Sequence, residues 1–157
     1  MALPRWTRQV LALAAVVAVG GTWWTVARGH DAAERTVSDA EARGYLDRIV
    51  AAARARDFDA LCAFNGAPRN CQRTLDYVGR DTVPEQPPTV VSTAWLSARG
   101  EEVAGVRVVV TGVDGRGKAY RTEVFVFRDD EATLKAINAV YWSNARLFAD
   151  GDATSPG

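Results

Sequence analysis

The spacing of apolar residues changes part-way along this 157-residue chain, and that change constrains the fold more than any other feature. Before residue 83 apolar side chains recur at helical spacing, and after residue 88 they alternate with polar ones, as in a half-buried strand. The segment between, Val83–Pro88 (VPEQPP), has three prolines, and each removes a backbone donor that a helix or central strand needs. Helices followed by antiparallel strands predict an α+β domain with its helices on one face of the sheet.

Ser38 and Glu41 predict where the first helix of this domain begins. A serine followed three residues later by a glutamate forms a capping box, in which each side chain accepts a hydrogen bond from the other residue's backbone amide. The stretch Asp39–Arg56 then carries one apolar stripe at helical spacing, made of Tyr45, Leu46, Ile49, Val50 and Ala53.

Two shorter helices are predicted to follow. Asp57 or Asp59 can cap the first of them, whose apolar face holds Phe58, Leu61, Cys62 and Phe64. The segment Asn65–Pro68 (NGAP) ends that helix. The second runs from about Asn70 to Val78 and is expected to bury Leu75 and Tyr77.

Four strands joined by short turns are predicted after the prolines: Thr89–Ala98, Val103–Thr111, Lys118–Arg128 and Thr133–Trp142. Alternation places Val106, Val108 and Val110 on one face, and Tyr120, Thr122, Val124 and Val126 on one face of the next strand. The glycines of Gly112–Lys118 (GVDGRGK) resemble a phosphate-binding loop, but Ala119 follows where a Ser or Thr would hold Mg²⁺. Because the segment lies between two strands, we predict a hairpin turn.

An uncharged run of 18 residues, Val10–Ala27, lies near the N-terminus. It is long enough to span a bilayer, and Trp6, Trp23 and Trp24 lie where interfacial aromatic belts would place them. Arg5 and Arg8 before the run favour a cytoplasmic N-terminus, and a cleaved signal peptide remains the alternative. The expected organisation is a cytoplasmic tail (1–9), a transmembrane signal anchor (10–27), a linker (28–37), an extracytoplasmic domain (38–148) and a disordered tail (149–157).

Cys62 and Cys71 are the only cysteines, and both lie in the part expected to be exported. In an oxidising compartment such a pair forms a disulfide, and closing a loop of this length stabilises a fold by roughly 2–3 kcal/mol. No CxxC motif is present, and the only histidine, His30, lies in the linker. We therefore expect no metal site, no cofactor and no His-dependent catalytic triad.

The formal net charge is zero, with 19 basic and 19 acidic residues, so the chain lacks the basic excess of a nucleic-acid-binding protein. The long first helix, the junction Ala55–Cys62 (ARDFDALC) and the strands that follow resemble the NTF2-like superfamily. This resemblance implies a cone in which three helices close over a curved four-stranded antiparallel sheet. Enzymes of that superfamily place an Asp with a His or Tyr inside the cone, which leaves Asp47, Asp57 and Asp76 as candidate acids here.

The resemblance, together with the anchor, implies a non-enzymatic, single-pass accessory or interaction domain of a bacterial cell envelope. Its expected partner is another envelope protein or a second copy of the chain. No catalytic residue is assigned. The alternatives are a binder of a small apolar ligand in the cone and a cone-type isomerase or hydratase. Four aromatic residues are the candidate lining of such a cavity: Trp95, Tyr120, Tyr141 and Trp142.

Overall fold

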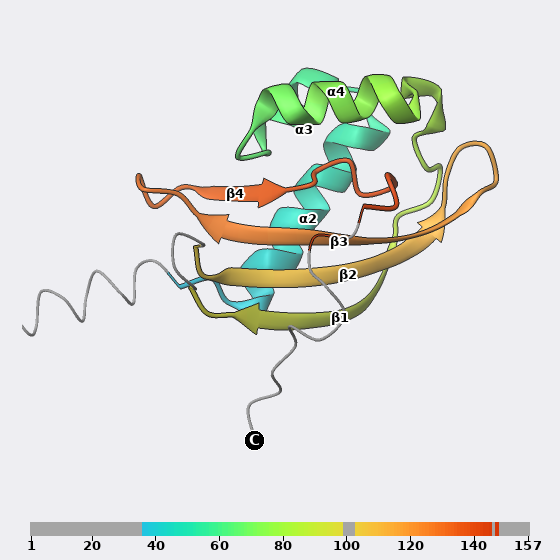
Figure 1. The fold of residues 1–157 in the computed structure, drawn as a ribbon. Coiled ribbons are helices and arrows are strands. Elements are labelled where there is room, and N and C mark those ends of the chain that lie inside the picture. The colour runs from blue at the N-terminus through green and yellow to red at the C-terminus, as the bar shows by residue number, and fades with distance from the viewer. Residues whose placement is uncertain (1–35, 99–102, 146, 148–157) are drawn as a thin grey trace, which may run out of the picture. The chain divides into compact units, whose positions relative to one another are not determined.

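The computed structural model describes residues 36–98, 103–145 and 147, which form three α-helices, a 3-10 helix and a four-stranded antiparallel sheet (Figure 1). The strands follow one another in the order β1-β2-β3-β4, so the α+β class and the predicted meander are confirmed. The elements are α2 (Asp39–Arg54), α3 (Phe58–Ala63), α4 (Pro68–Val78), η1 (Arg80–Thr82), β1 (Thr89–Leu96), β2 (Gly105–Val113), β3 (Ala119–Arg128) and β4 (Leu134–Ile137).

The expected anchor (10–27) and tail (149–157) lie outside the described residues. Within the described part, no helix combines the length and the apolar character needed to cross a membrane.

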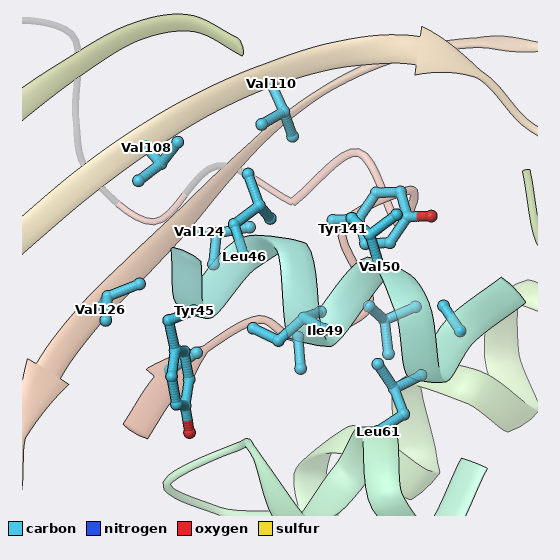
Figure 2. Close-up of a cluster of buried hydrophobic side chains, with 14 of the residues drawn as sticks. Tyr45, Leu46, Ile49, Val50, Leu61, Val108, Val110, Val124, Val126 and Tyr141 are labelled. Atoms are coloured by element: carbon cyan, nitrogen blue, oxygen red, sulfur yellow. The ribbon is translucent and has the colours of Figure 1, made fainter. Parts of the chain in front are cut away.

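Helix α2 lies across one face of the sheet and supplies one side of the core (Figure 1). Its predicted stripe is buried in full, and it faces the valines that β2 and β3 present on their shared side (Figure 2). The capping box is formed as predicted: the Glu41 amide donates to Ser38 Oγ (3.2 Å), and the Ser38 amide donates to Glu41 Oε2 (2.9 Å). Each fully buried aliphatic side chain of this layer stabilises the fold by roughly 1.5–3 kcal/mol.

Helices α3 and α4 are joined by the predicted disulfide between Cys62 and Cys71 (2.03 Å). Helix α4 begins at Pro68. Proline suits the first position of a helix, because the backbone N–H that it lacks would have no acceptor within the helix there. Leu75 is buried as expected, but the expectation for Tyr77 is wrong, since its side chain is 89% exposed. Two residues along a helix correspond to a rotation of about 200°, which turns Tyr77 away from the face that Leu75 buries.

The β2–β3 connection is a hairpin turn, as predicted from its glycines. Asp114 Oδ1 accepts hydrogen bonds from the amides of Arg116 and Lys118, both at 2.9 Å. Gly117 has a φ of +80°, a conformation that glycine adopts without strain.

The fourth strand is shorter than predicted: β4 ends at Ile137, and the expected continuation to Trp142 is wrong. Asn138, with a φ of +65°, turns the chain out of the sheet, and residues 139–142 are buried in the core. The part of β3 that lies beyond the end of β4 forms its backbone hydrogen bonds with other residues. Asn138 Nδ2 donates to the carbonyl of Glu123 (3.0 Å), and the Glu123 amide donates to the carbonyl of Ala145 (3.2 Å).

The two edges of the sheet differ. The outer edge of β4 is capped, because Ala136 donates to the Phe64 carbonyl (2.9 Å) and accepts from the Gly66 amide (2.8 Å). The Tyr45 hydroxyl also donates to the Leu134 carbonyl (2.6 Å) on this strand. The outer edge of β1 pairs with no strand in the described part.

Candidate functional site

Three of the four predicted aromatic residues lie together. The rings of Tyr120 and Tyr141 are 6.1 Å apart, and those of Tyr141 and Trp142 are 5.0 Å apart. All three side chains are buried, and Trp142 Nε1 donates to Thr82 Oγ1 at 2.8 Å. The inward turn after β4 positions Tyr141 and Trp142, so the cluster combines β3 with a segment that the sequence pattern assigned to a strand.

Trp95 does not join this cluster. It lies on β1 opposite Val106 of β2, whereas Tyr120 lies opposite Gly112 of the same strand. Six residues along a strand correspond to roughly 20 Å, so the predicted residues divide between two ends of the sheet. The side chain of Trp95 is 52% exposed.

The hydroxyl groups of Tyr120 and Tyr141 in this cluster, and that of Thr122 two residues along β3, are buried and form no hydrogen bond within the described part of the chain. The hydroxyl of Tyr141 points away from the valine layer (Figure 2). Burial raises the pKa of Tyr141 to about 12 and raises the pKa of Tyr120 further, so both phenols are neutral donors at physiological pH. A buried hydroxyl without a partner costs about 1–3 kcal/mol, so a group that bonded to any of these three would stabilise the fold.

The candidate acids do not reach the cluster. Asp47 is exposed, and Asp57 caps α3 by accepting from the Ala60 amide at 3.0 Å. Asp76 forms an exposed ion pair with Arg80 (3.6 Å). None of the described Asp and Glu side chains is buried, so within residues 36–98, 103–145 and 147 the interior presents neutral hydroxyls rather than a carboxylate base.

The second candidate site is the β1 edge, by which we mean the outer side of Thr89–Leu96 (TVVSTAWL). No residue of this strand is charged, and Val91 and Trp95 are about half exposed. A bulge at Val91 interrupts the pairing with β2, and the regular part extends from Ser92 to Leu96. Thr93 Oγ1 donates to Asp39 Oδ2 (2.6 Å), which ties the strand to the start of α2. The sequence pattern predicted this strand but not which of its sides lacks a partner.

Among the described residues, no group of three His, Cys, Asp or Glu side chains is arranged to hold a metal ion. No protein family, no curated protein and no solved structure matches this chain.

Proposed function

We propose that this chain is a non-enzymatic, single-pass membrane protein whose extracytoplasmic domain associates with a second copy of itself in a bacterial cell envelope. The uncharged run Val10–Ala27 supports the anchor, and the Arg residues before it support a cytoplasmic N-terminus. The disulfide between Cys62 and Cys71 supports an oxidising compartment. The order of three helices and a four-stranded meander supports placing the domain in the NTF2-like superfamily.

The β1 edge is the observation that carries the proposal of self-association. Soluble proteins usually protect an exposed edge strand with Lys, Pro or a covering segment, because its free backbone groups pair readily with another chain. The described part covers β4 in this way but leaves β1 uncovered and uncharged. Two copies of an uncharged strand also meet without like-charge repulsion.

The regular part of β1 defines a specific pairing. Antiparallel pairing centred on Ala94 uses Ser92–Leu96 of both copies, avoids the bulge at Val91 and joins two four-stranded sheets into one. Trp95 then lies opposite Thr93 of the second copy. Cross-strand pairs of this kind contribute about 0.2–1 kcal/mol each, in addition to the apolar surface that the indole buries.

The test counts copies of the full-length chain in lipid vesicles by single-molecule photobleaching of one fluorophore at the C-terminus. Wild type is compared with Trp95→Lys and with Val113→Lys. Val113 is a matched control because its side chain is 53% exposed, close to the 52% of Trp95, and it lies on β2 rather than on the open edge. Circular dichroism melting shows that each variant is folded.

We expect two bleaching steps for wild type and Val113→Lys, and one step for Trp95→Lys. One step for wild type would exclude self-association and point instead to a different protein as the partner of β1. Two steps for all three proteins would place the contact elsewhere.

The buried hydroxyls of Tyr120, Thr122 and Tyr141, which form no hydrogen bond within the described residues, favour a second function, the binding of a small ligand beside these three side chains. The ligand would carry hydrogen-bonding groups, in contrast to the apolar ligand expected from the aromatic residues alone. The double variant Tyr120→Phe/Tyr141→Phe tests it. With an empty interior the variant is as stable as wild type or more stable, because two unpaired hydroxyls are removed. A bound polar ligand makes the variant less stable, and its mass is then absent from native mass spectra of the variant.

A further inference from the structure

A groove of about 570 Å³ lies beside α4 and the chain that follows β3, and no residue of β1 lines it. Asn70, Thr74 and Tyr77 form its α4 side, at the spacing that places residues on one stripe of a helix. Phe127, Ile137 and Val140 are among its apolar lining residues. The volume lies within the range of about 300–1,000 Å³ that is usual for small-molecule sites.

The shape of the groove depends on two local features. Gly66 allows a close approach, because a Cβ at this position would lie 2.9 Å from the ring of Phe127. The inward turn at Asn138 brings Val140 and Ser143 to the opposite side. A glycine and a left-handed asparagine thus create a depression where a continuous β4 would have produced a flat edge.

The described lining is uncharged. Among the lining residues that the structure describes, none is Asp, Glu, Lys or Arg, so a charged group would lose hydration beside them without gaining an ion pair from them. The inner polar groups are already paired within the chain. Ser143 Oγ donates to Asn138 Oδ1 (3.0 Å), and Asn65 Oδ1 accepts from the Ala67 amide (3.0 Å). An apolar ligand body therefore leaves none of these groups without a partner.

The polar groups on the α4 side of the groove differ from the inner ones, because they are not all paired within the described part. The hydroxyl of Tyr77 and the side-chain Nδ2 of Asn70 form no hydrogen bond within the described part, and Asn70 Oδ1 accepts from Arg73. Tyr77 is 89% exposed. Both groups lie on the α4 side of the groove, where they can reach one polar substituent of a ligand whose body rests on Phe127 and Val140.

We propose that this groove binds a small neutral molecule with an apolar body and one hydrogen-bonding group. The site is separate from the β1 edge and does not depend on self-association. A variant that fails to dimerise can therefore still bind the ligand, and loss of binding leaves the copy number unchanged.

The experiment uses full-length chain in lipid nanodiscs and two fluorinated probes of the same shape, para-trifluoromethyl benzyl alcohol and para-trifluoromethyl benzoate. Binding is measured by ligand-observed fluorine NMR, with protein-free nanodiscs as the baseline for partition into lipid. Thr74→Trp fills the groove. Asp76→Trp is the matched control on the same helix, because Asp76 is exposed and does not line the groove.

We expect the alcohol to bind wild type and Asp76→Trp with affinities within twofold of each other, and to bind Thr74→Trp at least tenfold more weakly. The benzoate should show no binding above the baseline. Equal binding of the alcohol to all three proteins, equal binding of both probes, or no binding of the alcohol to wild type would each overturn the proposal. Circular dichroism confirms that Thr74→Trp is folded, so that a loss of binding reports on the groove.

Discussion

The hydrogen bond from Trp142 to Thr82 holds the inward-turned segment after β4 against η1. Trp142 Nε1 lies 2.8 Å from Thr82 Oγ1, and both side chains are only 3% exposed. The same hydroxyl donates to the carbonyl of Gly79 (2.6 Å). Substitution of Thr82 by valine keeps the shape of the side chain and removes both bonds, so it isolates the hydrogen bonding from the packing.

The expected loss in the free energy of unfolding follows from the groups that Thr82→Val leaves without a hydrogen bond. A buried indole N–H without an acceptor costs about 1–3 kcal/mol, and the lost bond to Gly79 costs about 1 kcal/mol more. We therefore expect a loss of about 3 kcal/mol. Trp142→Phe removes the same donor and part of the ring, for a loss of about 2 kcal/mol. The double variant loses the shared bond only once, so it should be about 1–2 kcal/mol more stable than the sum of the single losses predicts.

The assay is thermal unfolding of the full-length chain in mild detergent, followed by near-ultraviolet circular dichroism. For a domain of this size 1 kcal/mol corresponds to roughly 4 °C in Tm, so Thr82→Val should lower Tm by roughly 12 °C. Losses that add without coupling would refute the reasoning, because they would show that the indole of Trp142 does not bond to Thr82 in solution.

Replacing both Cys62 and Cys71 by serine should lower stability by about 2–3 kcal/mol, since the closed loop restricts the unfolded chain; a wild-type Tm unaffected by reductant would contradict the disulfide. Ser38→Ala should cost about 1 kcal/mol and Ser38→Gly only a few tenths, as measured by urea unfolding; equal costs would argue against the capping box. Burial raises the pKa of both Tyr45 and Tyr141 from 10.0 to about 12, so the folded chain holds these protons more tightly than the unfolded chain does. The contribution of these two raised pKa values to the free energy of unfolding is full below pH 10 and is lost as the pH rises towards 12. A Tm that stays constant across this range would contradict the raised pKa values.

Elements encoded by neighbouring residues were predictable from the sequence. The capping box at Ser38 needs only Glu41 three positions later, and the buried stripe of α2 needs only its helical period. The β2–β3 hairpin was predictable for the same reason, because Asp114 and its glycines satisfy the turn locally.

Features that depend on distant partners were not predictable. The run Ala139–Trp142 is apolar at every position, so it fits a buried strand as well as an irregular buried segment. What decides between them is Asn138, whose left-handed turn is compensated by its bond to Glu123 on another strand. The separation of Trp95 from the other aromatic residues and the capping of β4 by Phe64 are likewise set by contacts between elements far apart in the sequence.

The most direct test of the central proposal is native mass spectrometry of the full-length protein, released gently from the membranes of its own host. The account predicts a species of twice the 17.0 kDa chain mass, with residues 1–27 retained in both copies. A chain shortened at its N-terminus would contradict the anchor. An uncleaved chain that is present as a single copy or only with a different protein would contradict self-association through β1.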